Sequence, residues 1–142
     1  MLSTMQNKKE MITLRKDELL VKIIHDRNEM GRVAADEVTA KIIGLLNEKD
    51  EINMIFAAAP SQNEFIADLI SRPEIDWNRI NAFHMDEYIG LKSDATQAFG
   101  NFLKERIFGK VPFKNVFYLN GLASDLSEEC ERYSELLVKY PV

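Results

Sequence analysis

The sequence predicts an α/β fold with a mostly parallel sheet flanked by helices. Two observations support this prediction. Segments with the pattern of a strand alternate along the chain with segments that have the 3.6-residue period of a helix, and this alternation produces right-handed β–α–β crossovers. In addition, 142 residues with 46% hydrophobic and 29% charged side chains have the size and composition of one globular domain.

The first part of the chain is predicted to contain a leader, a strand and a long helix. Residues 1–16 are polar without a sustained period, which indicates a flexible leader before a domain that begins at about residue 17. Leu19–His25 has the composition of a strand. Asp26 and Glu29 form a capping box, so we expect a helix from about residue 27 to 48. Its expected apolar face repeats every three or four residues and comprises Met30, Ala34, Val38, Ile42 and Leu45.

A second strand, Ile52–Ala59, is expected to end at Pro60. Ser61 is a suitable N-cap for a helix that reaches about Arg72, and Glu64 completes a second capping box. The unpaired N–H groups at such a helix start can bind an anion. Ser61 can equally satisfy these donors by itself, so the spacing leaves an anion site and a capped helix as equal alternatives.

The stretch Ile80–Gly90 joins a strong strand pattern to a pair of acidic side chains. It starts with a short apolar run and leads to the adjacent carboxylates of Asp86 and Glu87. Open α/β sheets bind ligands beyond the carboxyl ends of their strands. The pair is therefore a candidate catalytic site, and a solvated loop or a helix N-cap is the alternative interpretation.

The last third of the chain continues the alternation. We expect a helix that ends at Gly109, a short strand at Val116–Leu119 and a turn at Asn120–Gly121. A final helix begins at about Ser127. Its expected inward side chains are Cys130, Tyr133, Leu136 and Leu137, with Cys130 as a small core residue, which is the usual place of a free cysteine.

Charge and composition exclude several classes of partner. The formal net charge of −5 leaves no basic stripe for nucleic acid. No apolar run approaches the roughly 18 residues of a membrane span. One cysteine and a polar start without a signal peptide predict a cytoplasmic protein.

The segment Phe83–Leu91, with the sequence Phe-His-Met-Asp-Glu-Tyr-Ile-Gly-Leu, closely resembles the Met-Asp-Glu-Tyr segment of glucosamine-6-phosphate deaminases. Leu119–Gly121 and the acidic run Glu128–Tyr133 follow in the same order and at similar separations as in that family. The resemblance extends from about Leu20 to the end of the sequence. Related 6-phosphogluconolactonases typically carry an arginine after the Asp-Glu pair, so Tyr88 favours the deaminase branch.

The resemblance implies a three-layer sandwich like the sugar-phosphate isomerase/deaminase fold, and the conversion of glucosamine 6-phosphate to fructose 6-phosphate and ammonia. Asp86 would transfer a proton between C2 and C1 of the sugar through an enediol-type intermediate, and partial burial would make it a better base. The residues expected to bind the substrate are Ser61, Gln62, Asn63 and Glu87.

The expected partner is thus a small sugar phosphate, and a homo-oligomer is compatible with the resemblance. Neither a cofactor nor a metal ion is expected. His84 is expected to be structural, because a lone histidine is usually a satisfied side chain.

Two departures from the family pattern define the alternatives. The phosphate loop of the family is usually glycine-rich with a threonine, whereas Ser61–Glu64 has no glycine and adds a negative charge. The ring-opening histidine and its supporting acids are expected beyond Val142. Residues 17–142 are therefore predicted to be the N-terminal part of a truncated domain that is inactive alone. The alternatives are a non-catalytic sugar-phosphate-binding or regulatory module and a 6-phosphogluconolactonase-like hydrolase.

Overall fold

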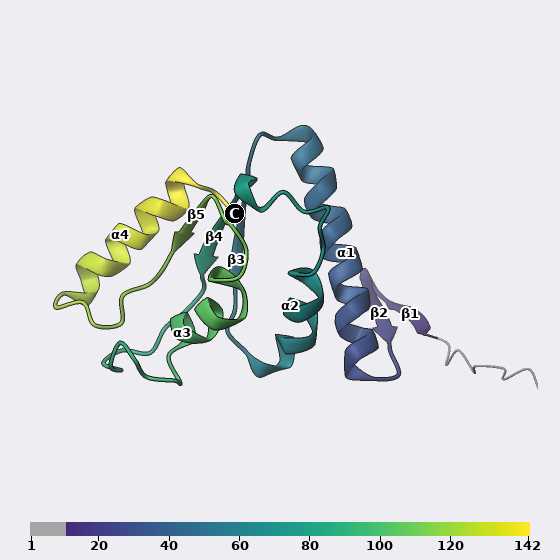
Figure 1. The fold of residues 1–142 in the computed structure, drawn as a ribbon, viewed down its shortest axis with the longest axis horizontal. Coiled ribbons are helices and arrows are strands. Elements are labelled where there is room, and N and C mark those ends of the chain that lie inside the picture. Colours follow the sequence, from purple (N-terminus) through teal and green to yellow (C-terminus); the bar gives the residue numbers. More distant parts are fainter. Residues whose placement is uncertain (1–10) are drawn as a thin grey trace, which may run out of the picture.

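A three-stranded parallel sheet forms the centre of the protein. The computed structural model describes residues 11–142, and its sheet has the order β3-β4-β5, with β3 at Ile52–Phe56, β4 at Ile80–His84 and β5 at Asn115–Phe117. Helices lie on both sides of this sheet (Figure 1). All five residues of β4 are buried, as expected of a central strand in a parallel sheet. The predicted α/β class and the predicted strand at Ile80 are confirmed.

The N-terminal strands form a separate antiparallel hairpin. β1 (Ile12–Lys16) pairs with β2 (Leu19–Ile23), and Asp17, with φ of 53°, lies in the turn between them. The predicted strand at Leu19 therefore exists, but its partner is β1 and not the parallel sheet. The prediction of a flexible leader is wrong for Ile12–Lys16, because Ile-Thr-Leu alternates apolar and polar side chains as a half-exposed strand does. Residues 1–10 of that leader lie outside the described residues.

The long helix α1 (Arg27–Glu48) begins and ends where the sequence predicts. Asp26 caps it by accepting a hydrogen bond from the backbone N–H of Glu29 at 2.9 Å. The predicted apolar face is displaced, however, because Met30 is exposed. The buried positions are Gly31, Ala35, Thr39, Ile42 and Leu46.

Close packing of α1 against α2 (Asn63–Leu69) explains this displacement. A Cβ atom at Gly31 would lie 2.7 Å from the backbone carbon and the Cβ of Glu64, so this position admits only glycine without a shift of one helix. The closest approach of the two helices thus uses a residue that carries no hydrophobic signal. A pattern of apolar residues alone could not identify that face.

The helical layer of α1 and α2 is completed by α3 (Phe99–Leu103), which continues as a π-helical turn over Lys104–Phe108. This agrees with the helix predicted to end at Gly109. Together these elements bury one face of the sheet in a single apolar core. The largest fully buried apolar side chains of this core are Ile42, Ile66, Leu69, Ile80, Leu103 and Ile107.

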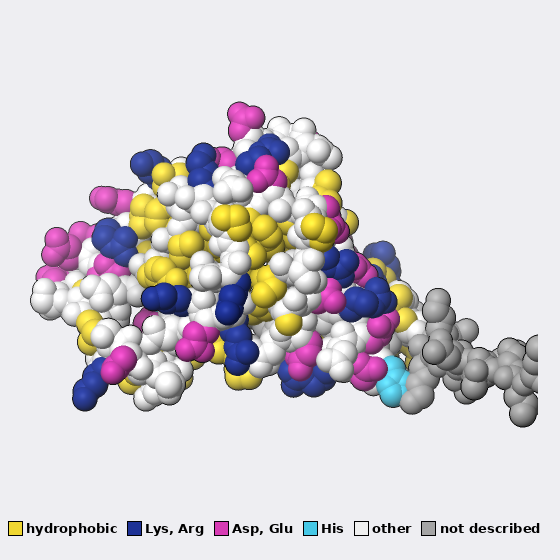
Figure 2. Space-filling model, in the orientation of Figure 1, with side chains coloured by type: hydrophobic (Ala, Val, Ile, Leu, Met, Phe, Trp, Pro, Cys, Tyr) yellow, Lys and Arg dark blue, Asp and Glu magenta, His cyan; other side chains and the backbone are white. Residues whose placement is uncertain are grey.

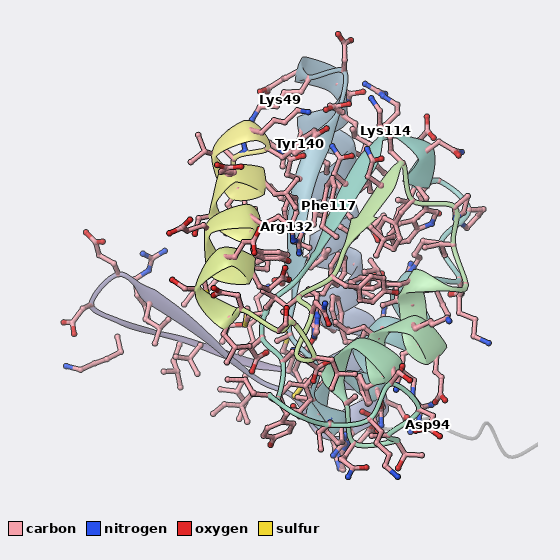
Figure 3. All side chains as sticks on the ribbon, turned by 90° about the vertical axis from the view of Figure 1, so that its left-hand side faces the viewer. Lys49, Asp94, Lys114, Phe117, Arg132 and Tyr140 are labelled. Atoms are coloured by element: carbon pink, nitrogen blue, oxygen red, sulfur yellow. The ribbon has the colours of Figure 1, made fainter. Side chains whose placement is uncertain are left out.

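The other face of the sheet packs against α4 (Leu126–Lys139) through aromatic side chains. The Phe117 ring lies 5.2 Å from the Tyr140 ring, and Figure 3 shows both between the sheet and the helix. Tyr133 is buried, and Leu136 and Leu137 are half-buried. Cys130 is exposed, so its predicted place in the core is wrong. Cys130 thus lies on an exposed side of α4, whereas Tyr133 of the same helix is buried.

A ladder of three asparagines crosses the same face. Asn81 donates to Asn53 at 2.8 Å, Asn115 donates to Asn81 at 2.7 Å, and Asn53 donates to the carbonyl of Pro141 at 2.9 Å. These asparagines are register partners on adjacent strands. A slip of one residue would place apolar neighbours opposite buried amides, so the ladder helps to fix the register of the sheet.

Hydrophobic side chains gather near the middle of the face seen in Figure 2, in the region between the sheet and α2. Charged side chains surround them. Within residues 11–142, no helix is long and apolar enough to span a membrane.

Candidate functional site

The carboxyl edge of the sheet brings the two predicted site segments to neighbouring positions. β3 and β4 are parallel partners, with Phe56 opposite His84, and the N–H of Met85 donates to the carbonyl of Phe56 at 3.1 Å. The segment with Ser61 follows β3 and the segment with Asp86 follows β4. Both therefore leave the sheet at the same edge, which is where open α/β sheets place ligands.

Asp86 lies directly beyond the buried central strand, and its side chain is exposed. The described residues therefore do not provide the partial burial that would make Asp86 a better base. The reason is that the fully buried strand β4 ends at His84, and both Met85 and Asp86 beyond it are exposed. The result is an accessible carboxylate next to a rigid strand end.

Glu87 points toward the backbone of α3. Its Oε1 accepts hydrogen bonds from the N–H groups of Tyr88 and Phe99 at 2.9 Å, and its Oε2 accepts one from Gly100 at 2.8 Å. Burial alone would raise the pKa of Glu87, but these backbone donors outweigh it and lower the pKa. The contact between Glu87 and substrate remains a prediction, whereas its role as a helix cap is observed.

This capping role was missed by sequence reasoning, although a signal existed. The residue before α3 is Ala98, which has no side chain that could cap the helix. The first N–H groups of a helix need an acceptor, so a carboxylate from elsewhere in the chain was to be expected.

His84 is fully buried between the sheet and α3. Its Nδ1 accepts a hydrogen bond from the N–H of Leu119 at 3.4 Å, and its Nε2 lies 3.8 Å from Oε2 of Glu87. Burial lowers the pKa of His84, and the opposing effects of the Glu87 and Asp86 carboxylates are smaller. The imidazole is therefore neutral at physiological pH.

The segment after β3 differs from its prediction. Pro60–Gln62 forms a 3-10 turn and α2 begins at Asn63. No side chain of residues 11–142 caps either element, so the predicted N-cap role of Ser61 is wrong. The N–H of Gln62 donates to Ala59 and that of Asn63 donates to Pro60. These two donors are thus used within the turn, because a 3-10 turn closes its hydrogen bonds one residue earlier than an α-helix.

Arg27 compensates for the negative charge of Glu64. Its Nε and Nη2 donate to the two carboxylate oxygens of Glu64 at 3.0 and 2.6 Å, and Nη2 also donates to the carbonyl of Pro60 at 3.1 Å. The hydrogen bonds from Arg27 lower the pKa of Glu64. Ser61 and Gln62 line a cavity of about 250 Å³ next to this pair. Sequence reasoning missed Arg27, since 37 residues separate the two charges.

The turn at Asn120–Gly121 closes the other side of the Asp86 segment. The N–H of Gly90, with φ of 82°, donates to the carbonyl of Gly121 at 2.8 Å. A Cβ at Gly121 would lie 2.2 Å from the carbonyl of Tyr88, so the two loops are in close contact. Glu129 fixes this turn by accepting the N–H of Asn120 at 2.7 Å. Beside it is a cavity of about 310 Å³, lined in part by Tyr88, Lys92, Lys104 and Tyr118.

Comparison with known sequences finds similarity to glucosamine-6-phosphate deaminases. The enzyme of Streptococcus suis (strain 05ZYH33) is 32% identical over 122 residues, which cover 86% of this chain and 50% of that protein. The enzyme of Ligilactobacillus salivarius is 39% identical over 85 residues, which cover 60% of this chain and 36% of that protein. The chain spans about half the length of most of the curated relatives it matches. No protein-family model matches the sequence.

Solved structures show the same fold. A monomeric glucosamine-6-phosphate deaminase superposes with a TM-score of 0.69 at 24% identity, over 82% of this chain and 48% of that one. The 6-phosphogluconolactonase of Thermotoga maritima gives 0.71 at 24% identity, over 82% and 52%. That of Plasmodium vivax gives 0.76 at 12% identity, over 90% and 47%. The sequence comparison confirms the resemblance: this chain is similar to glucosamine-6-phosphate deaminases over most of its own length and about half of theirs, and the structures agree in fold.

Proposed function

We propose that this chain is part of a sugar-phosphate isomerase/deaminase that converts glucosamine 6-phosphate and water to fructose 6-phosphate and ammonia. Asp86 is the proposed base that moves a proton between C2 and C1 of the sugar. The observation that carries the proposal is the exposed Asp86 carboxylate directly beyond the buried central strand, in a segment that resembles the deaminase motif.

The chemistry requires a carboxylate that is accessible but held in place. The base must remove a weakly acidic C–H proton from C2 and return it to the neighbouring carbon, so its oxygens must reach both atoms. Before Asp86, the N–H of Met85 is hydrogen-bonded to β3. After it, the carboxylate of Glu87 is hydrogen-bonded to the backbone of α3. Glu87 contributes to the proposed mechanism by this tie, and its direct contact with substrate stays a prediction.

The phosphate group of the substrate is proposed to bind at the end of β3, through the Ser61 hydroxyl and the side chains of Gln62 and Asn63. The pairing of Glu64 with Arg27 supports this placement, because it removes the repulsion that an isolated carboxylate would exert on a phosphate dianion. The ring-opening residues remain predicted beyond Val142.

The test is an ammonia-release assay on the full-length natural protein, with glucosamine 6-phosphate as substrate. Unphosphorylated glucosamine is the matched control for the phosphate site, and 6-phosphogluconolactone tests the hydrolase alternative. We expect ammonia from the phosphorylated amino sugar only. Lactone hydrolysis without ammonia would identify a lactonase, and binding of the sugar phosphate without turnover would identify a binding module.

A further inference from the structure

The environment of His84 differs from that of a satisfied core histidine. Its side chain has 0% exposure, and its Nε2 has no hydrogen-bond partner among the described residues. A neutral imidazole carries one proton, and an Nδ1 that accepts from Leu119 leaves this proton on Nε2. The Nε2–H group therefore faces the Glu87 carboxylate across 3.8 Å.

Glu87 and His84 flank the exposed pair Met85 and Asp86. On the His84 side, the Tyr133 hydroxyl donates to the His84 carbonyl at 2.5 Å. On the Glu87 side, the carboxylate accepts hydrogen bonds from three backbone N–H groups. The backbone of Gly100 packs against both, since a Cβ there would lie 3.2 Å from Glu87 Oε2 and 3.5 Å from His84 Cε1.

We propose that His84 is a positioning residue for Asp86. Its imidazole accepts a hydrogen bond from the Leu119 backbone and faces the Glu87 carboxylate across 3.8 Å, an electrostatic contact and not a hydrogen bond, so it packs between the segments on either side of the proposed base. This inference rests on the proposed function, because the consequence of these contacts is the placement of the Asp86 carboxylate at C2 and C1. His84 itself does not touch substrate, since it is buried behind the strand end.

Burial keeps the imidazole neutral against the two carboxylates that face it. The charged groups around it are the Glu87 and Asp86 carboxylates, and the Tyr118 ring packs edge-on at 5.9 Å. A small change in the direction of Glu87 would move Asp86 with it, because the two residues are adjacent. Displacement of a catalytic group by about 1 Å can reduce turnover by roughly 100-fold.

The kinetic test compares His84→Leu with His84→Asn in the full-length natural protein. Leucine removes both polar contacts, whereas asparagine keeps an acceptor near the position of Nδ1. We expect His84→Leu to lower kcat by roughly 10-fold to 100-fold with KM within about twofold of wild type. His84→Asn should recover most of the loss. Wild-type kcat in His84→Leu, or equal loss in both variants while both keep the wild-type thermal midpoint, would overturn the proposal.

Two further measurements separate this proposal from the proposed function. Nitrogen chemical shifts of the imidazole should show the Nε2–H tautomer at neutral pH without any substrate, and the Nδ1–H tautomer or a charged ring would overturn the positioning role. Asp86→Asn is assayed in parallel. If Asp86→Asn is inactive while His84→Leu is fully active, only the positioning role fails; if Asp86→Asn is fully active, the proposed function fails.

Discussion

Glu87 and Gly100 join the loop that carries Asp86 to α3 through one hydrogen bond of 2.8 Å between a carboxylate oxygen and a backbone N–H. The same carboxylate accepts the N–H of Phe99, so one acidic side chain caps the start of a helix that has no local cap. Glu87 was predicted to contact substrate. In the structure it caps α3, and this contact also holds the neighbouring residue Asp86.

Replacement of Glu87 by glutamine should destabilise the protein. Glutamine keeps the shape but loses the charge, and one end of its amide would present N–H groups to the N–H donors of α3. We expect the free energy of unfolding to fall by about 1–3 kcal/mol. Urea unfolding measures this value, with Glu105→Gln on the exposed surface of the π-helical turn as the control. An equal effect of the two substitutions would contradict the capping role.

The two glycines of α1 provide a matched pair. An added Cβ at Gly44 would have no neighbouring atom of the described residues within 4 Å, so Gly44→Ala should raise the free energy of unfolding by about 0.5–1 kcal/mol through helix propensity. At Gly31 an added Cβ would lie 2.7 Å from Glu64, so Gly31→Ala should destabilise the protein in spite of the same gain. Thermal or urea unfolding of both variants measures these opposite changes in stability. Stabilisation by Gly31→Ala would show that α1 and α2 are not in close contact.

The pH dependence of stability should contain a contribution from His84. Its folded pKa lies below the unfolded value of about 6.5, because burial disfavours the charged ring. The unfolded state therefore binds more protons between these two pKa values. The contribution of His84 to the free energy of unfolding is complete above about pH 6.5 and is lost as the pH falls toward the folded pKa. Urea unfolding from about pH 7.5 to about pH 5 should show a smaller slope in His84→Asn than in the wild-type protein.

The sequence predicts those parts of the fold that local patterns specify. The bounds of α1, the buried strand at Ile80 and the pairing of strands with helices follow from periodicity and capping residues. The buried face of α1 does not, because its contact with α2 is made by Gly31, which has no apolar side chain. The hairpin was missed because β1 is polar on one face and exposed throughout, which resembles a leader.

In the candidate site, too, the sequence predicts some features and not others. The place of Asp86 after the central strand is predictable from the order of apolar and acidic residues. The partners of Glu87 and Glu64 are not, because they come from distant parts of the chain: Gly100 on α3 and Arg27 on α1. Long-range hydrogen bonds of this kind depend on how the helices pack, and no local pattern encodes that packing.

Loss of Arg27 should weaken the binding of a sugar phosphate. In Arg27→Met the Glu64 carboxylate would be unpaired beside Ser61 and Gln62, and it would repel the phosphate group. We expect KM to rise by a few-fold, up to about fivefold, as is typical of exposed charge interactions, with little change in kcat. The double variant with Glu64→Gln should restore KM. An unchanged KM in Arg27→Met would remove this pair from the substrate site.

The substitution Asp86→Asn should abolish most of the proposed deaminase activity and leave the fold intact. Asparagine has nearly the same shape but cannot accept the C2 proton, so the loss measures general-base chemistry and not packing; the exposure of Asp86 makes a structural cost small. We expect kcat for ammonia release from glucosamine 6-phosphate to fall by roughly 100-fold or more, with a thermal midpoint like that of the wild type. Asp94→Asn, another exposed aspartate in the loop before α3, is the matched control and should retain activity. Exchange of the C2 proton with deuterated water should disappear together with ammonia release, because both require the same proton transfer. Near-full activity in Asp86→Asn would assign the base to another residue.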